Sequence, residues 1–251
     1  MKSLIRLGAI ALIAVAAMSG AQAASIAESI ANENRADANR ERDGDRKPDQ
    51  VLEFIGLESG AVVLDWGAGG GYWAELFAGV AGSGGKVYAH QNAGERFESQ
   101  KAALTEQFAP FGNIELLPLA RGAAIPLDDN TVDAVMVSYL YHHMHYTEAS
   151  GESFPDGSSA LFTEYHRVLK PGGVLIIIEH QAAEGSSRAQ SAAWHRVPAA
   201  AARADAASVG FEFAGEAPEI FNNPDDDEMN MWGEAGLRGK TTSIVHKYRK
   251  P

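Results

Sequence analysis

Apolar positions along this chain fall into two alternating patterns. Short continuous runs with many β-branched residues are typical of buried strands, and they occur at 61–66, 86–90, 113–119, 131–138 and 174–179. Two further strands are expected from 211 onward and at 241–248. Apolar residues at helical spacing predict helices at 49–56, 72–80, 95–108, 158–169 and 198–209. The alternation predicts an α/β fold, with a doubly wound, mostly parallel sheet of seven strands and helices on both faces.

The first 23 residues have the pattern of a cleaved signal peptide. Lys2 and Arg6 precede an apolar run at 7–18, and Ala21-Gln22-Ala23 resembles a cleavage site. The apolar run is too short to span a membrane, and no cysteine follows it for lipid attachment. We expect export to the periplasm, or secretion, after cleavage near Ala23, without a stable membrane anchor.

Residues 24–47 differ from the rest of the chain because they are polar and only weakly periodic. Asn32, Arg35, Asn39 and Arg42 recur near helical spacing. A helical or flexible lead-in and a lid over the site are both compatible with this pattern. Residues 48–251 are expected to form the main domain, since Pro48 suits the first turn of a helix.

Composition limits the possible partners. Residues 24–251 are numerous enough for one well-cored α/β domain. Without Lys2 and Arg6, 19 basic side chains face 33 acidic ones, a formal net charge of −14 that argues against binding nucleic acid. The absence of cysteine excludes disulfides, thiolate metal sites and cysteine nucleophiles. The sequence does not indicate an oligomeric state.

A glycine-rich turn follows the strand at 61–66. Asp65 near the end of the strand is followed in the turn by Gly67, Gly69 and Gly71, so that the four residues recur at intervals of two. Glycine lets a backbone turn sharply and approach a ligand, and the helix that follows directs its N-terminal amides at the turn. A dinucleotide fingerprint would need glycine at Tyr72, and no Gly-Lys-Ser/Thr phosphate loop follows. The turn therefore predicts a site for a polar ligand of another kind.

Three blocks together resemble the class I S-adenosylmethionine-dependent methyltransferases. The glycine turn is followed by Pro126-Leu-Asp-Asp-Asn-Thr-Val-Asp133 and then by Tyr165-His-Arg-Val-Leu-Lys-Pro-Gly-Gly173. The resemblance covers roughly 50–180 and implies a Rossmann-like methyltransferase fold with S-adenosylmethionine as cofactor. Further segments resemble an exported subgroup of predicted methyltransferases, namely Arg46-Lys-Pro48, His195-Arg196, Asn223-Pro-Asp-Asp226 and Arg238-Gly-Lys-Thr241.

The resemblance also implies which residues hold the cofactor. The three glycines would wrap its methionine part, and Asp65 would orient the loop and meet the amino group. The family usually has an acidic ribose-binding residue after the second strand, where this chain has Gln91 and Asn92. These neutral groups would make weaker hydrogen bonds to the ribose than a carboxylate. The usual acidic residue near the adenine is also missing. The full predicted cofactor set is Asp65, Gly67, Gly69, Gly71, Tyr72, Gln91, Asn92 and Ser138.

Histidines and tyrosines gather after the strand at 131–138. Ligands of open α/β sheets lie beyond the carboxyl ends of the strands, so this stretch is expected to face the cleft. His142, His143 and His145 are candidate general bases. His142 and His145 are also spaced to share a metal ion, but no third ligand is evident and we predict no metal site. A simple polar lining of the cleft is a third interpretation. Second candidates for the acceptor side are Tyr139, His180, His195 and Arg196.

The segment before the last strand offers two further features. Met229, Met231 and Trp232 are expected to fold back as a flap over the cleft. The acidic residues at 225–228 lack the alternation and glycine of a calcium loop, so we expect a solvated acidic loop.

Two functional hypotheses remain. The first is an exported enzyme that transfers a methyl group from S-adenosylmethionine to a small-molecule acceptor, chiefly by positioning the reactants. The second is a non-catalytic ligand-binding protein that retains the fold. The missing acidic residues favour the second, and the glycine turn with its companion blocks favours the first.

Overall fold

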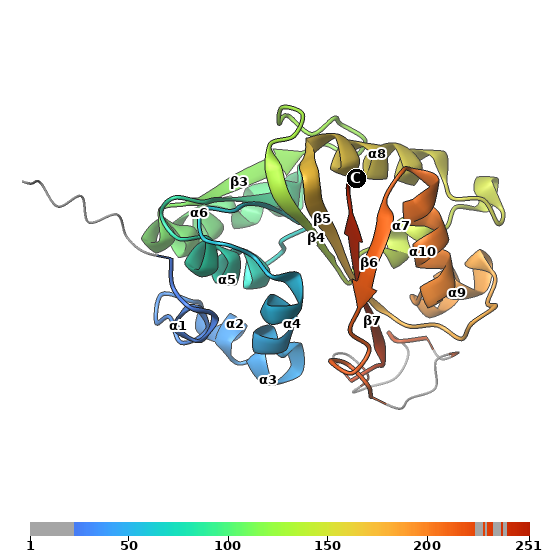
Figure 1. Cartoon of the computed structure of the whole chain (residues 1–251), viewed down its shortest axis with the longest axis horizontal. Helices are drawn as coiled ribbons and strands as arrows, with labels where there is room; N and C mark the ends of the chain where they lie inside the picture. Colours follow the sequence, from blue (N-terminus) through green and yellow to red (C-terminus); the bar gives the residue numbers. More distant parts are fainter. Residues whose placement is uncertain (1–22, 224–227, 229, 233–236, 238–239) are drawn as a thin grey trace, which may run out of the picture.

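The fold is built on one seven-stranded sheet with helices on both faces (Figure 1). The computed structural model describes residues 23–223, 228, 230–232, 237 and 240–251. The signal-peptide prediction for 1–23, apart from Ala23, therefore lies outside the described residues, as do Met229 and most of the acidic loop. Among the residues that are described, no helix has the length and apolarity that crossing a membrane requires.

The strands alternate with helices along the chain as the periodicity predicts. The strands are β1 (Val62–Trp66), β2 (Lys86–Asn92), β3 (Ile114–Leu119), β4 (Val132–Ser138), β5 (Leu169–His180), β6 (Glu212–Glu216) and β7 (Ser243–Arg249). The main-domain helices are α4 (Pro48–Ile55), α5 (Tyr72–Ala81), α6 (Glu95–Phe108), α7 (His142–His145), α8 (Asp156–Val168), α9 (Arg188–Trp194) and α10 (Ala199–Ser208). The short helices α7 and α9 were not predicted.

The strand order is β3-β2-β1-β4-β5-β7-β6. Strands β1 to β5 pair in parallel, and β7 runs antiparallel between β5 and β6. The order reverses at β1 and β4, so the carboxyl ends of these two strands flank the crevice where ligands of such sheets bind. The predicted fold, a mostly parallel, doubly wound sheet, is confirmed.

Each face of the sheet is covered by its own apolar core. On one face α4, α5 and α6 pack against inward side chains such as Val63 and Met136. On the other face α8 and α10 pack against Leu64 and Val135. Successive residues of a strand point to opposite faces, which explains why the central strands are apolar throughout. In Figure 1 the two helical layers lie on either side of the sheet.

Residues 24–47, for which a helical or flexible lead-in and a lid were both considered, contain three short helices. These are α1 (Ile26–Ile30), α2 (Asp37–Arg40) and α3 (Asp43–Arg46), which lie together beside α4 and α5 (blue in Figure 1). Ser29 packs so closely on α5 that a Cβ at Gly79 would lie 2.6 Å from its Oγ. The amide of Ala24 also donates to the carbonyl of Gly79 (3.1 Å). The segment is thus docked on the main domain, as the lid interpretation requires.

Candidate active site

The turn between β1 and α5 has the left-handed backbone that its glycines allow. Gly67, Gly69 and Gly71 have φ values of 72°, 54° and 79°. A Cβ on Gly67 would lie 2.0 Å from Cδ1 of Leu140, and one on Gly71 would lie 2.4 Å from Cε1 of Phe108. A Cβ on Gly69 would meet nothing closer than 3.9 Å, so this glycine leaves space open above the loop. Two glycines therefore allow the packing of the loop, and the middle one allows close approach of a ligand.

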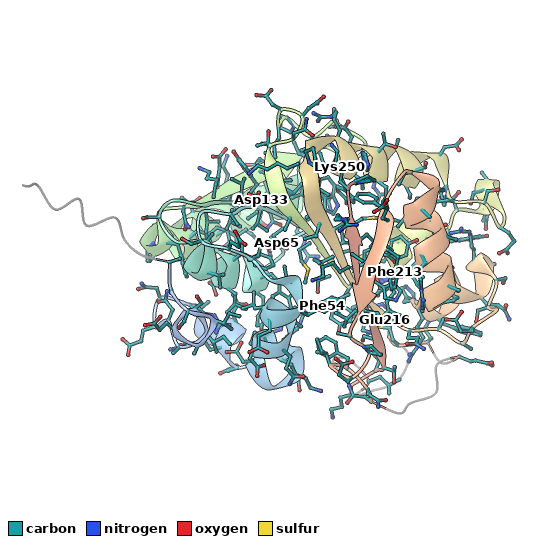
Figure 2. All side chains as sticks on the ribbon, viewed as in Figure 1. Phe54, Asp65, Asp133, Phe213, Glu216 and Lys250 are labelled. Atoms are coloured by element: carbon teal, nitrogen blue, oxygen red, sulfur yellow. The ribbon has the colours of Figure 1, made fainter. Side chains whose placement is uncertain are left out.

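Asp65 brings a buried carboxylate to the start of this turn. Only 2% of the residue is exposed, and Oδ2 has no hydrogen-bond partner within the described protein. Burial raises the pKa of Asp65 to about 7, although a backbone hydrogen bond from Ala74 and the charge of Arg46 oppose the shift. Figure 2 shows Asp65 in the interior of the molecule. A buried acceptor without a partner is costly in itself, and it suits the cationic amino group of a bound amino acid.

The end of β2 braces the loop from the other side. Gln91 donates from Nε2 to the carbonyl of Gly69 (2.8 Å), and the amide of Gly67 donates to Nδ1 of His90 (3.1 Å). The His90 ring stacks on Trp66 with centroids 3.6 Å apart. The Gln91 amide is thus already bonded to the loop, whereas Asn92, also predicted to meet the ribose, is exposed at the end of β2.

Residues of the N-terminal helices clamp the start of α5. The Arg35 side chain is fully buried and pairs with both oxygens of Asp43 (2.8 and 2.7 Å). Burial opposes the charge of Arg35, but the hydrogen bonds and charge of Asp43 raise its pKa. The Tyr72 hydroxyl donates to Oδ1 of Asp43 (2.8 Å). The hydroxyl of Tyr72, a residue predicted to bind the cofactor, therefore holds α3 on the domain.

A second tie joins the same helices to the glycine turn itself. Asn39 and Gln107 both donate to the carbonyl of Gly70 (3.0 and 2.8 Å). The same two amides donate to the carboxylate of Glu75 (2.9 and 2.7 Å). Because Glu75 also accepts from the amide of Ala36 (3.2 Å), the N-terminal segment, the turn and α5 form one network.

A cavity of about 340 Å³ lies where these parts meet the carboxyl ends of β4 and β5. It joins the cofactor loop to the predicted acceptor side, which is the arrangement a two-substrate transfer needs. Met231 and Trp232 reach it, as the flap prediction requires. Its lining comprises Arg42, Asp45, Arg46, Gly67, Ser138, Tyr139, Leu140, His142, His180, Met231 and Trp232.

Ser138 and Tyr139 form the wall of this cavity at the end of β4. Ser138 Oγ accepts from Nε1 of Trp73 (3.1 Å) and from Nη1 of Arg46 (3.3 Å). Tyr139 has a φ of 55°, a strained backbone for a residue with a side chain. The guanidinium of Arg46 lies over its ring at 5.0 Å, and the ring of His180 lies 4.4 Å from it. Arg46 therefore belongs to the site, although no site role was predicted for it.

His180 and His142 reach the cavity from two different elements. His180 is 5% exposed, and its Nδ1 lies 2.6 Å from Oγ1 of Thr241. Burial lowers the pKa of His180 to about 4, so its ring is neutral near pH 7. Nδ1 of His142 lies 2.9 Å from Oε2 of Glu179, a fully buried carboxylate at the end of β5.

Two more histidines surround His142. The ring of His143 lies 4.0 Å from that of His142 and the ring of His195 lies 5.5 Å from it. Burial lowers the pKa of both His143 and His195, and the neighbouring charge of His142 acts in the same direction. Trp232 packs edge-on against His195 at 6.2 Å. The predicted histidines 142, 143, 180 and 195 therefore gather at one end of the sheet.

Two predicted site residues lie elsewhere. His145 is 1% exposed and contacts Asp205 (3.1 Å) and Arg188 (2.9 Å) in a buried polar network outside the cavity. Arg196 is fully buried and donates to the carbonyl of Gln181 (3.1 Å), so it is not placed to meet an anionic acceptor. The structure thus places both side chains in internal contacts outside the lining of the cavity.

The pairing of His142 with His145 on a metal ion is not supported either. The two rings face different partners, Glu179 and Asp205. Across the part of the chain that the structure describes, no three histidine or carboxylate side chains are grouped to hold a metal ion.

A larger hollow of about 430 Å³ lies at the opposite edge of the sheet. Its walls come from the loop after α4 and from Asp133, Lys170 and Gly172 near the amino end of β4 and the start of β5. Lys170 already pairs with Asp133 (2.8 Å). Since ligands of these sheets bind at the carboxyl ends of the strands, we assign the active site to the smaller cavity.

Comparisons with known proteins agree with this geometry. Residues 64–177 match the family model described as "Methyltransferase domain". The ubiquinone/menaquinone biosynthesis C-methyltransferase UbiE of Francisella philomiragia is 32% identical over 130 residues, 52% of this chain and 47% of that protein. UbiE of Enterobacter sp. is 28% identical over 191 residues, 74% of this chain and 70% of that protein. This chain thus spans about half the length of the Francisella relative.

A solved structure shows the same fold. The S-adenosylmethionine-dependent methyltransferase of Aquifex aeolicus superposes with a TM-score of 0.58 at 20% identity, covering 83% of this chain and 91% of that one. The chain therefore has the fold of this S-adenosylmethionine-dependent methyltransferase, and its residues 64–177 match a methyltransferase domain model. The Aquifex protein is named as dependent on S-adenosylmethionine, the cofactor that the sequence of this chain predicts. The domain match does not favour the non-catalytic alternative.

Proposed function

We propose that this protein transfers the methyl group of S-adenosylmethionine to a small-molecule acceptor bound in the cavity of about 340 Å³. The cofactor supplies an electrophilic methyl group on a sulfonium. The protein holds the two reactants next to each other and excludes water, which accounts for much of the rate of such transfers.

The partnerless Oδ2 of Asp65 is the observation that carries the cofactor half of the proposal. It lies on β1 two residues before the turn, whose Gly69 leaves room for a ligand, and it would offer a carboxylate to a cationic amino group. Asp65, Gly67 and Gly69 would hold the amino-acid part of the cofactor. Gln91 would support the loop rather than grip the ribose, since its amide already bonds to Gly69.

The acceptor half rests on the lining of the same cavity. Tyr139, Trp232 and Met231 offer apolar and aromatic surface, while His142 and His180 offer polar nitrogens. The named relatives act in ubiquinone and menaquinone biosynthesis, which extends the proposal to aromatic small molecules as first acceptors to try. The net charge of −14 for residues 24–251 favours a small acceptor over nucleic acid.

Transfer of a labelled methyl group tests this function. Residues 24–251 would be incubated with S-adenosylmethionine carrying a tritiated methyl group and with a small-molecule extract of the host cell envelope. We expect label to enter the small-molecule fraction, and Gly69→Asp to abolish the transfer because its carboxylate fills the space left for the cofactor. Label that stays in the cofactor with every extract fraction and with aromatic probes such as quinols would contradict the proposal.

We further infer that the protein acts outside the cytoplasm, because Lys2, Arg6 and the apolar run at 7–18 form a signal-like segment. Fusion of residues 1–30 to an alkaline phosphatase reporter, which is active only after export, would check this. An inactive reporter, with an established signal peptide as the positive control, would refute the location without affecting the enzymatic proposal.

A further inference from the structure

Arg46 brings a positive charge to the cavity from the N-terminal helices. It is the last residue of α3, and it lines the cavity together with Gly67 and Ser138. Its Nη1 donates to Oγ of Ser138 (3.3 Å), the last residue of β4. Because Ser138 also accepts from Nε1 of Trp73 (3.1 Å), the guanidinium is tied to the start of α5 as well as to the sheet.

Aromatic rings and a strained backbone hold the same guanidinium in place. It lies 5.3 Å from the ring centroid of Tyr72 and 5.0 Å from that of Tyr139. Lys47, the next residue, has a φ of 44°, which costs strain for a residue with a side chain. Such strain persists where the surrounding structure enforces it, and here Nζ of Lys47 donates to the carbonyl of Ile220. Contacts of Arg46 itself and of its neighbour therefore set its position at the cavity.

Asp65 supplies the opposite charge on the same face of the sheet. It is aligned with Met136 of β4, and Ser138 lies two residues further along that strand, so the side chains of Asp65 and Ser138 point to one face. Burial raises the pKa of Asp65 to about 7, and the charge of Arg46 is one of the two influences that oppose this shift. The partnerless Oδ2 of Asp65 and the guanidinium of Arg46 thus bring a negative and a positive group to the region of the glycine turn.

This pair of charges is complementary to a zwitterion. The amino-acid part of S-adenosylmethionine carries an ammonium group and a carboxylate on the same carbon atom. A guanidinium has five N–H donors, so Arg46 can bond to Ser138 and to a carboxylate at the same time. Asp65 attracts only the ammonium group. Asp45 also lines the cavity, but it is exposed, so water screens its repulsion of a carboxylate.

From this geometry we propose that Arg46 binds the carboxylate of the methionine part of S-adenosylmethionine, while Asp65 binds its ammonium group. The proposal rests on the proposed function. It makes the N-terminal helices a part of the cofactor site, because the group that meets the carboxylate comes from α3. Ligands that retain the nucleoside but lack the carboxylate should therefore bind more weakly.

The direct test compares two ligands that differ only in this carboxylate. Isothermal titration near pH 8 measures how tightly residues 24–251 bind the demethylated product of S-adenosylmethionine and the decarboxylated form of that product. We expect the wild-type protein to prefer the ligand with the carboxylate by about tenfold to hundredfold, the contribution of a charge-assisted hydrogen bond. In Arg46→Gln the two affinities should agree within about threefold, because the amide has no charge to distinguish the ligands.

Two further arginine variants serve as comparisons. Arg40→Gln is the matched control, because Arg40 belongs to the same segment and its pair with Asp37 is exposed. This variant should keep the wild-type preference for the carboxylate. Arg42 is the other guanidinium that lines the cavity. If Arg42→Gln lost the preference while Arg46→Gln kept it, the carboxylate site would belong to Arg42 and the proposal would be overturned.

Hydrogen exchange at residues 37–46 gives an independent readout. At saturation, the demethylated product should slow exchange there in the wild-type protein, because its carboxylate adds a tie between α3 and the bound ligand. The decarboxylated ligand at saturation should slow exchange less. Equal protection by the two ligands would contradict the proposed contact.

A purely structural role of Arg46 gives a different result. Loosening of the N-terminal helices in Arg46→Gln would weaken both ligands by the same factor and leave the ratio of their affinities unchanged, which would overturn the proposal. Binding of both ligands by the wild-type protein without a preference would refute the role of Arg46 and leave the cofactor assignment standing. Binding of neither ligand would refute the cofactor assignment and this inference with it.

Discussion

At the scale of single residues, Asp65 combines an expected cost to stability with a binding role. Its pKa of about 7 in the folded protein lies above the ordinary value of 3.8. Folding therefore favours the protonated form of Asp65. This preference stabilises the folded protein fully below pH 3.8, and the stabilisation is lost as the pH rises through about 7. Above pH 7 the fold carries a buried charge that a cationic ligand would relieve.

Replacing this carboxylate should therefore stabilise the protein while it weakens the cofactor site. At pH 8 we expect Asp65→Asn to raise the free energy of unfolding by roughly 2–4 kcal/mol, since a buried charge is removed. At pH 3.5 the difference should nearly vanish. Urea denaturation at the two pH values checks this, with Asp129→Asn, an exposed partner of Arg167, as the control. If Asp65→Asn were less stable than the wild type at pH 8, the raised pKa of Asp65 would be contradicted.

The same group predicts how binding depends on pH. Because the ionised carboxylate attracts the amino group, affinity for S-adenosylmethionine should rise between pH 6 and pH 8, by up to about tenfold as the group ionises around its pKa of about 7. Calorimetric titration across this range measures the effect. Asp65→Asn should show a weaker affinity without this rise, and an unchanged pH profile in that variant would disprove the role of Asp65.

At the scale of elements, the glycine turn separates packing from ligand access. Alanine at Gly71 would place its Cβ 2.4 Å from the Phe108 ring with φ at 79°, so we expect a loss of roughly 2–4 kcal/mol of stability. Alanine at Gly69 meets open space and should cost only about 1 kcal/mol of strain. It should nevertheless weaken cofactor binding by tenfold or more. Thermal unfolding measures the loss of stability in both variants, and calorimetry measures their loss of cofactor affinity. Equal losses of stability in the two variants would contradict the different roles of Gly69 and Gly71.

The N-terminal helices form the second element that the account depends on. Asp43 neutralises Arg35, whose side chain is fully buried, and it also anchors Tyr72. Asp43→Ala should cost about 3–5 kcal/mol of local stability because it leaves a buried charge without a partner.

Hydrogen exchange at residues 26–46 is the measurement for this prediction. We expect faster exchange there in Asp43→Ala and little change in β1, together with weaker cofactor binding. Asp37→Ala is the control in the same segment, since its pair with Arg40 is exposed. Exchange that is unchanged in Asp43→Ala would show that the segment is held in another way.

The sequence predicts the strands and long helices well, because their apolar runs reflect burial on both faces of the sheet. It also locates the glycine turn, whose φ values need glycine. It does not predict that residues 24–47 dock on the domain, since their contacts are polar and join residues far apart, as Asn39 and Gly70 show. His145 and Arg196 look like site residues in sequence, but tertiary packing directs them inward. Nothing in the sequence marks Glu179 as part of the site except its position at the end of a predicted strand.

At the scale of the whole molecule, the site is assembled at the reversal of strand order. The turn after β1 provides the cofactor side, and the ends of β4 and β5 provide the histidines. The N-terminal helices close the cavity from outside with Arg42 and Arg46, and Met231 and Trp232 approach it from the C-terminal region. Segments that are distant in the sequence therefore contribute to one cavity, as a transfer between two bound molecules requires.

The central claim is that this cavity and turn bind S-adenosylmethionine through Asp65. Isothermal titration of residues 24–251 with S-adenosylmethionine and its demethylated product at pH 8 tests it most directly. The account predicts saturable binding of both ligands at one site, with affinity reduced about tenfold to hundredfold in Asp65→Ala, the loss of one charge-assisted hydrogen bond. Asp129→Ala should bind like the wild type. No binding by the folded wild-type protein, or equal binding by Asp65→Ala, would contradict the account.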